Sequence, residues 1–232
     1  MTKTALIMGA GSGISASFAR ALHREGYTVA LAARTRANIE EFASTIGATA
    51  HACDATKPDQ VAELFTRLDA AGHQLDVVLY NASARAPGPI TDIDPEAAFN
   101  ALSISAYGGF LTAQQAAKRM VPRGQGTILF TGASASVKGY PQSSVFAMGK
   151  HGLRGLASAL GRELAPKGVH VCHFVIDGGV RNALKSRVEG PADPPDKFLC
   201  PDAIAETYMH VVKQDRSAWT WEIELRPYGE KY

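Results

Sequence analysis

The chain has few cysteines, and none of them are close together. Its three cysteines, Cys53, Cys172 and Cys200, form no C-x-x-C pair. This spacing argues against a disulfide framework and against a structural zinc site. We expect buried thiols in a reducing cytoplasm, and we predict no metal site.

The chain also lacks a strong charge and a long apolar run. Its formal net charge is only +2, and its basic residues are scattered rather than gathered in blocks. Nucleic acid and anionic membranes are therefore not expected partners, whereas a small-molecule substrate is. The first residues show neither a cleavable signal pattern nor a membrane-spanning run. We expect a cytoplasmic protein.

Short apolar segments alternate with amphipathic helical segments along almost the whole chain. Hydrophobic residues make up 46% of the 232 residues, enough for one core and a single domain over residues 1–232. The alternation predicts an α/β fold, a doubly wound parallel sheet of seven strands with helices on both faces. The expected strands are residues 5–8, 28–32, 49–53, 75–80, 127–131, 170–176 and 220–225, the last of them an edge strand.

Two long helical stretches are expected at residues 95–120 and 144–165. Small residues along the second stretch would let another helix approach closely, so these helices predict a homo-oligomer, a dimer or a tetramer. Residues 189–201 hold four prolines and no periodicity. A loop of this kind in a compact domain predicts a lid or a binding loop.

A glycine-rich turn follows the first predicted strand and opens the first helix. Glycines here let the backbone approach a pyrophosphate, whose charge is met by free amides and by the positive end of the helix. Its place in the first βα unit predicts a dinucleotide site. The turn reads Gly9-Ala10-Gly11-Ser12-Gly13-Ile14-Ser15, and we expect cofactor contacts from Gly9, Gly11, Ser12, Gly13 and Ile14.

The end of the second predicted strand indicates which dinucleotide is preferred. An acidic residue there would bind the adenosine ribose and repel a 2′-phosphate. The chain has Arg34 instead, followed by Arg36, and a guanidinium suits a phosphate. We therefore expect NADP(H), with NAD(H) as the alternative. The competing interpretation is that Arg34 is only a solvated residue at a strand end.

Over almost its whole length the chain resembles the short-chain dehydrogenase/reductase family, which implies a Rossmann-like domain. The family turn reads Thr-Gly-x-x-x-Gly-x-Gly; Gly9 and Gly13 match, whereas Met8 and Ser15 differ. The resemblance implies that Asp54 contacts the adenine. It also matches Asn81-Ala82 to the start of an Asn-Ala-Gly turn. Other cofactor contacts are expected from Ala55, Lys150 and Gly178.

The tyrosine that transfers the proton in this family is missing. Its signature is Tyr-x-x-x-Lys, in which the lysine lowers a phenol pKa of about 10. Here Lys150 is present, but Phe146 occupies the tyrosine position, Ala133 the serine position and Ser105 the asparagine position. A benzyl ring cannot exchange a proton, so the usual mechanism is not available. The chain resembles a branch of the family that carries Phe here.

Three kinds of residue could replace the proton donor. Tyr140 lies in a segment that could reach over the nicotinamide, or it is a surface tyrosine. Asp177 could act as an acid if burial raised its pKa, or Asp177-Gly178 is an ordinary turn. Ser134 and Ser136 could orient a carbonyl oxygen. His170 and His173 lie an odd number of positions apart on one strand, so they cannot share a metal.

Two functions remain open. The preferred one is an NADP(H)-dependent oxidoreductase of this family, acting on an unknown carbonyl or alcohol with a degenerate Asn-Ser-Tyr-Lys set, because the cofactor-binding parts are kept. The alternative is a non-catalytic dinucleotide-binding protein, a sensor or a partner subunit. Retention of Lys150 fits both, since the lysine also holds the nicotinamide ribose in the family.

Overall fold

Seven parallel strands form the centre of the molecule in the computed structural model, which describes residues 3–229. The strand order is β3-β2-β1-β4-β5-β6-β7, so the chain reverses direction across the sheet between β1 and β4. This order confirms the predicted doubly wound parallel sheet. The strands are β1 (Thr4–Met8), β2 (Thr28–Ala33), β3 (Thr49–Ala52), β4 (Leu75–Tyr80), β5 (Gly126–Thr131), β6 (Val169–Ile176) and β7 (Glu222–Leu225).

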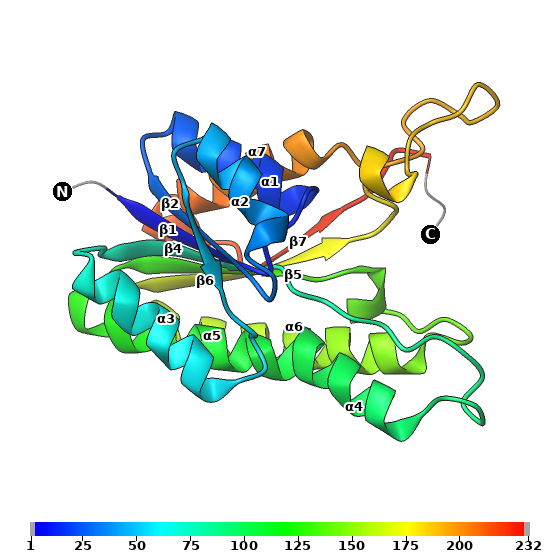
Figure 1. The fold of residues 1–232 in the computed structure, drawn as a ribbon, viewed down its shortest axis with the longest axis horizontal. Helices are drawn as coiled ribbons and strands as arrows, with labels where there is room; N and C mark the ends of the chain where they lie inside the picture. Colours follow the sequence, from blue (N-terminus) through cyan, green and yellow to red (C-terminus); the bar gives the residue numbers. More distant parts are fainter. Residues whose placement is uncertain (1–2, 230–232) are drawn as a thin grey trace.

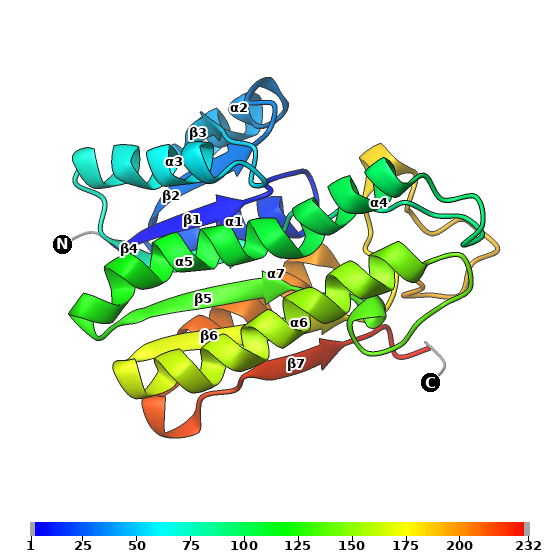
Figure 2. The same ribbon diagram turned by 90° about the horizontal axis from the view of Figure 1, so that it is seen from below.

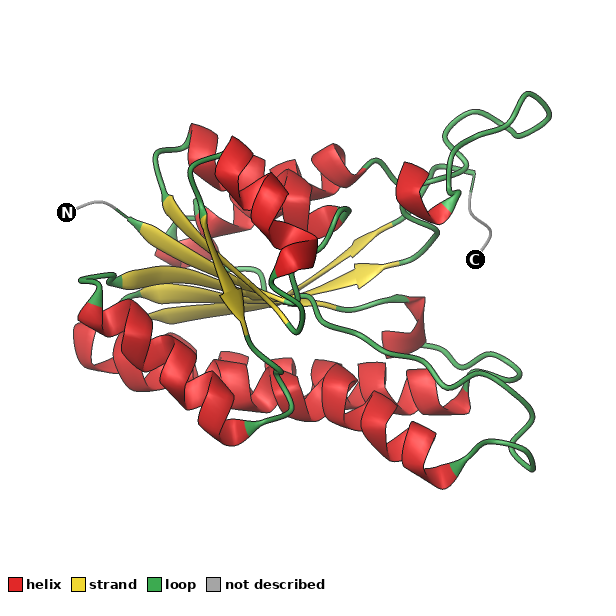
Figure 3. Ribbon diagram, viewed as in Figure 1, coloured by secondary structure: helices red, strands yellow, loops and turns green. Residues whose placement is uncertain are grey.

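Helices cover both faces of the sheet (Figures 1 and 3). On one face lie α1 (Ile14–Arg24), α2 (Ala37–Thr45) and α7 (Pro201–Val212). On the other lie α3 (Pro58–Ala70), α5 (Gly108–Met120) and α6 (Ser144–Leu164). Figure 2 shows α4 (Pro95–Leu102) continuing from α5 beyond the sheet, beside the start of α6. No helix among residues 3–229 is both long and apolar enough to cross a bilayer.

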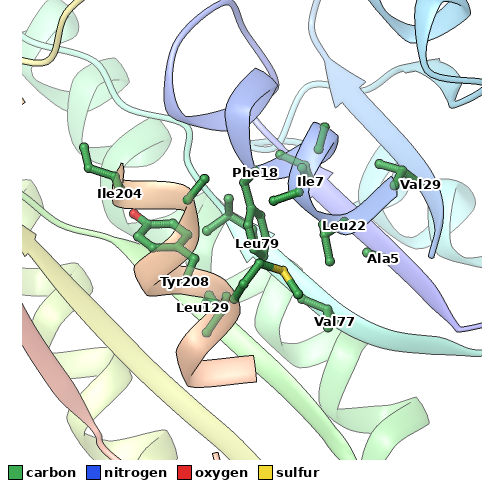
Figure 4. Close-up of a cluster of buried hydrophobic side chains, with 14 of the residues drawn as sticks. Ala5, Ile7, Phe18, Leu22, Val29, Val77, Leu79, Leu129, Ile204 and Tyr208 are labelled. Carbon is green, nitrogen blue, oxygen red and sulfur yellow. The ribbon is translucent and has the colours of Figure 1, made fainter. Parts of the chain in front are cut away.

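Two apolar layers fill the space between the sheet and the helices. Successive residues of β1 point to opposite layers, and all of them are buried. This explains why the strands are apolar at nearly every position. In the layer drawn in Figure 4, Phe18 of α1 packs edge-on against Tyr208 of α7. The Tyr208 hydroxyl is hydrogen-bonded to Thr131 Oγ1 at 3.0 Å, so this aromatic residue joins α7 to the end of β5.

The stretch predicted as one helix at 95–120 is interrupted. A π-helical turn, Ser103–Tyr107, separates α4 from α5. Within it Ser105 is buried, and its hydroxyl is hydrogen-bonded to both backbone groups of Ala84 at 3.2 Å. A Cβ on Gly149 of α6 would lie only 2.8 Å from Cβ of Ser105. The wider turn therefore brings Ser105 close to both the loop after β4 and α6, at the end of the sheet where the cavity lies.

The last strand lies at the sheet edge as predicted, but it begins at Glu222 rather than at residue 220. Trp219 and Thr220, just before it, are held by side chains instead. The Trp219 indole stacks on the His170 ring with centroids 4.7 Å apart. The backbone N–H of Thr220 donates to Gln214 Oε1, and its carbonyl lies 2.9 Å from His170 Nε2. These bonds take the backbone groups that a longer strand would have paired.

Candidate active site

A cavity of about 650 Å³ opens at the carboxyl ends of the strands. Its wall comes from the first turn and from residues at the ends of β2 to β6. In a doubly wound sheet this crevice, where the strand order reverses, is where ligands bind. The structure brings all the predicted cofactor residues to this one wall: Gly9, Gly11, Ser12, Gly13, Ile14, Arg34, Asp54, Ala55, Asn81, Ala82, Lys150 and Gly178.

The first turn depends on Gly9 for two physical reasons. Its φ of +80° is a conformation that side chains disfavour. A Cβ at this position would also lie 2.3 Å from the backbone nitrogen of Ala82. The N–H groups of Gly9 and Ala10 both donate to the Ala32 carbonyl at 2.9 Å. The turn is thus fixed between the ends of β2 and β4.

Ser15, which departs from the family turn, ties this turn to β4. The Asn81 amide donates to Ser15 Oγ at 2.7 Å and to the Gly9 carbonyl at 3.3 Å. Ser15 Oγ in turn donates to the same Gly9 carbonyl at 3.3 Å. Sequence reasoning did not foresee this role, because it requires the two chain segments to be neighbours. At Gly13, before the first residue of α1, no side chain caps the helix, so its first amides face the cavity uncapped.

One end of the cavity carries Arg34 and Asp54. Partial burial raises the pKa of Asp54, but hydrogen bonds from Thr56 and the nearby charges of Lys57 and Arg34 outweigh burial and lower it. Asp54 is therefore a carboxylate with fixed orientation. Arg36 does not line the cavity, since it pairs with Glu40 at 2.7 Å.

The other end carries Lys150, Phe146, Ala133 and Thr131. Lys150 is buried, and its ammonium donates to the Thr131 carbonyl at 2.8 Å. Burial and, second, the charge of Arg85 lower the pKa of Lys150 to about 7. Phe146 lies one helical turn earlier on α6, with 9% of its surface exposed. Among the described residues that line this end, the lysine is therefore the group with a pKa near neutrality.

Neither predicted serine lines the cavity. Ser134 begins a short 3₁₀ turn, and Ser136 is fully buried behind it. Ser136 Oγ accepts from the Ala133 N–H at 3.1 Å and lies 3.3 Å from His173 Nε2. Nδ1 of His173 in turn lies 3.0 Å from the Glu222 carboxylate. Burial, only partly opposed by Glu222, lowers the pKa of His173 to about 4. A neutral His173 thus links Ser136 to the Glu222 carboxylate behind the cavity, and the Arg154 guanidinium pairs with that carboxylate at 2.6 Å.

Asp177 and Tyr140 also lie away from the cavity wall. The Asp177 carboxylate is buried between two cations, Lys138 at 3.2 Å and Arg226 at 3.0 Å. Tyr140 is 44% exposed, with the Lys138 ammonium over its ring. None of the candidate proton donors from the sequence therefore lines the cavity, and Lys150 is the one predicted catalytic residue that does. Among residues 3–229, no three His, Cys, Asp or Glu side chains are grouped so as to hold a metal ion.

The loop that reaches the cavity differs from the predicted one. Lining residues come from Gly178 to Arg187, and none from 189–200. The Asn182 amide donates to Ser12 Oγ at 3.2 Å, which joins this segment to the first turn. Most of residues 189–200 lead outward instead, as the yellow-orange loop in Figure 1 shows, and the segment returns to the core at Leu199. The Arg181 guanidinium donates to the Glu189 carboxylate at 2.6 and 3.0 Å and holds the base of that loop.

Arg85 is a cavity residue that sequence reasoning missed. It lies in the loop after β4, and its guanidinium carbon sits 4.1 Å from the centroid of the Phe146 ring. The only sequence signal was a basic residue shortly after Asn81-Ala82. That signal does not say which way the side chain turns.

The family model for short chain dehydrogenases matches residues 3–189. An uncharacterised oxidoreductase of Staphylococcus aureus strain MRSA252 is 27% identical over 228 residues, 97% of each chain. A crystal structure of a short-chain dehydrogenase from Rhodopseudomonas palustris is 32% identical, with a TM-score of 0.83 over 97% of this chain and 99% of that one. An alcohol dehydrogenase from the archaeon Thermococcus sibiricus, complexed with 5-hydroxy-NADP, is 25% identical, with a TM-score of 0.88 over 100% and 99%.

Replacing Gly9 by Ala should lower the free energy of unfolding by ~1–3 kcal/mol, because the residue has a positive φ and the new Cβ meets the Ala82 backbone. The measurement is urea unfolding followed by circular dichroism. Gly11→Ala is the matched control, since nothing lies within 4 Å of a Cβ there, and it should change stability by no more than ~0.5 kcal/mol. Equal losses in both variants would contradict the close approach of the two backbones.

Proposed function

The chain belongs to the short-chain dehydrogenase/reductase family, and from this premise we propose that it is an NADP(H)-dependent oxidoreductase that interconverts a carbonyl compound and an alcohol. The observation that carries the proposal is that one cavity joins the first-turn glycines and Arg34 to Lys150. NADPH, when bound, supplies the hydride. The chain's own residues bind the phosphates, orient the substrate and supply one proton.

The residues at the first turn fit a dinucleotide. The Gly9 backbone leaves no room for a side chain against Ala82, and the uncapped start of α1 offers amides to a pyrophosphate. Arg34 offers a permanent fork of N–H donors to a 2′-phosphate, which favours NADP(H) over NAD(H). The similar Thermococcus sibiricus alcohol dehydrogenase, complexed with an NADP derivative, supports this choice.

Lys150 is the residue that we propose as the proton donor. An ammonium has three N–H donors. Within residues 3–229, Lys150 makes one hydrogen bond, to the Thr131 carbonyl. With a pKa of about 7 it holds a proton that can be lost near neutrality, as an efficient general acid requires. As negative charge develops on the substrate oxygen, the Lys150 N–H bond breaks and an O–H bond forms. The neutral amine then takes a proton from water.

Phe146 explains why this work falls to the lysine. Its ring lies in the cavity wall one helical turn before Lys150, with the lysine Nζ 6.0 Å from the ring centroid. The ring offers neither a donor nor an acceptor. Ala133 likewise offers only a methyl group, so no hydroxyl from the Ser or Tyr position competes for the substrate oxygen.

Arg34→Ala should weaken NADPH binding about 10- to 100-fold, because a hydrogen-bonded charge pair is lost. Binding of NADH, which has no 2′-phosphate, should change little. Isothermal titration calorimetry measures both affinities. Arg36→Ala is the control, because that arginine pairs with Glu40 outside the cavity. Equal weakening of NADPH and NADH binding by Arg34→Ala would count against selection of the 2′-phosphate.

The rate of carbonyl reduction should fall as pH rises through about 7, since Lys150 must be protonated to act as the acid and its pKa is about 7. Below that pH the profile should be flat. A plot of kcat/KM for NADPH oxidation against pH tests this. Lys150→Arg keeps the charge but cannot release a proton at neutral pH. It should remove the inflection and lower kcat about 10²- to 10⁴-fold. An unchanged inflection in Lys150→Arg would exclude this lysine.

Phe146→Tyr, alone or with Ala133→Ser, should add a phenol beside Lys150 and raise NADPH oxidation with generic diketones or aldehydes by at least about tenfold. Absorbance of NADPH follows the reaction. Phe146→Leu, which supplies no hydroxyl, is the control and should give no gain. A broad screen of compounds would test the alternative. If the parent, Phe146→Tyr and the double variant with Ala133→Ser all bind NADPH but turn over no compound, the chain is the non-catalytic dinucleotide-binding protein of the alternative hypothesis.

A further inference from the structure

Among the side chains of residues 3–229, none neutralises the charge that Arg85 carries at the cavity. Its guanidinium lies over the face of Phe146, with Cζ 4.1 Å from the ring centroid. Within residues 3–229, the Arg85 side chain makes no hydrogen bond and no ion pair. The aromatic face attracts the cation but accepts no conventional hydrogen bond. The guanidinium is thereby held in place while its five N–H donors remain available to a ligand.

Further cations stand near Arg85. Lys150, Lys185 and Arg187 line the same cavity. Burial and, second, the charge of Arg187 lower the pKa of Arg85, and Arg85 acts in the same sense on Lys150. These positive charges therefore repel one another, at a cost in free energy that a bound anion would remove.

The neighbouring carboxylates do not balance this charge. Asp54 is the acidic side chain among the lining residues, and it is bound by Thr56 at the Arg34 end. Asp177 is occupied by Lys138 and Arg226. Glu189 is occupied by Arg181. Within the described part of the chain, the Phe146 end of the cavity is thus positive and has no carboxylate to pair with.

We propose that the substrate carries an anionic group, a carboxylate or a phosphate, and that this group is bound by Arg85, whose guanidinium is held against the Phe146 ring. The inference rests on the proposed function. The carbonyl or hydroxyl that reacts faces Lys150. Arg187, which is exposed like Arg85, adds a second positive charge at the loop. A planar guanidinium binds carboxylate and phosphate oxygens in pairs, so Arg85 fixes the orientation of the substrate as well as its charge.

The charge of the cofactor does not account for Arg85. The amides that fit the pyrophosphate belong to the first turn and the start of α1, and the guanidinium that fits the 2′-phosphate is Arg34. Arg85 lies with Phe146, at the Lys150 end. Arg85→Met should therefore leave the affinity for NADPH unchanged within about threefold, whereas loss of a phosphate contact would weaken it about tenfold or more.

The test compares charged and neutral forms of the same compound. Straight-chain 2-oxo and 3-oxo acids are assayed with NADPH beside their methyl esters, and dihydroxyacetone phosphate beside dihydroxyacetone. In the parent protein, kcat/KM should be at least about tenfold higher for the charged member of the productive pair. Arg85→Met should remove this preference, so that the two members of the pair react at equal rates even if the loss of the Arg85 charge changes both rates through the pKa of Lys150. Arg85→Lys should keep part of the preference. The pair that is turned over shows whether the anionic group of the substrate is a carboxylate or a phosphate.

The matched control is Arg162→Met, which removes the same charge near the far end of α6, where Arg162 binds Ser158. It should keep the full preference for the charged compound. Equal rates for charged and neutral compounds, with no selective effect of Arg85→Met, would overturn the anion site while the oxidoreductase function stands.

A binding measurement separates this inference from the proposed function. Benzoate and inorganic phosphate are titrated into the NADPH-saturated protein by calorimetry, with benzamide as the neutral control. If no compound in the screen is turned over, the proposed function fails. Anion binding that is lost in Arg85→Met would then still support the site. Binding that is absent, or unchanged in Arg85→Met, would overturn it.

Discussion

The contact on which the site depends is the close approach of two backbones, at Gly9 after β1 and Ala82 after β4. A Cβ on Gly9 would lie 2.3 Å from the Ala82 nitrogen. Ser15 and Asn81 then join the same two segments by hydrogen bonds. Since β1 and β4 are the strands between which the sheet order reverses, this contact fixes the crevice at the point where the cavity lies. The start of α1 and the loop that carries Arg85 take their positions from it.

From this fixed point the two ends of the cavity acquire different chemistry. At one end a single arginine, Arg34, lies near the Asp54 carboxylate, which is already hydrogen-bonded to Thr56. At the other, Lys150 is buried against a backbone carbonyl, and more cations gather without a carboxylate. Burial of a charge is costly unless it is paired. Much of that cost is met by lowering the pKa of Lys150 to about 7, which makes the lysine a usable acid at neutral pH.

The sheet could be predicted from the sequence because five of its strands, β1, β2, β4, β5 and β6, are largely buried on both faces, so their residues are mostly apolar regardless of register. The phosphate turn could also be predicted, since its glycines are required by the local backbone. Features that depend on distant partners could not. The π-helical turn at 103–107 arises where Ser105 meets Ala84 and Gly149. Asp177, which the sequence offered either as an acid or as part of an ordinary turn, is paired with Lys138 and Arg226.

The role of Phe146 looks different in the sequence and in the folded protein. In the sequence, Phe146 stands where the Tyr-x-x-x-Lys pattern has a tyrosine, so a hydroxyl is missing. In the folded protein it is also an aromatic face that holds the Arg85 guanidinium, and this relation joins a residue of α6 to a loop 61 positions earlier. A tyrosine ring would offer Arg85 the same kind of aromatic face, but it would also add a hydroxyl beside Lys150. The phenylalanine therefore removes a hydrogen-bonding group from the cavity wall while it keeps the face that holds the Arg85 guanidinium.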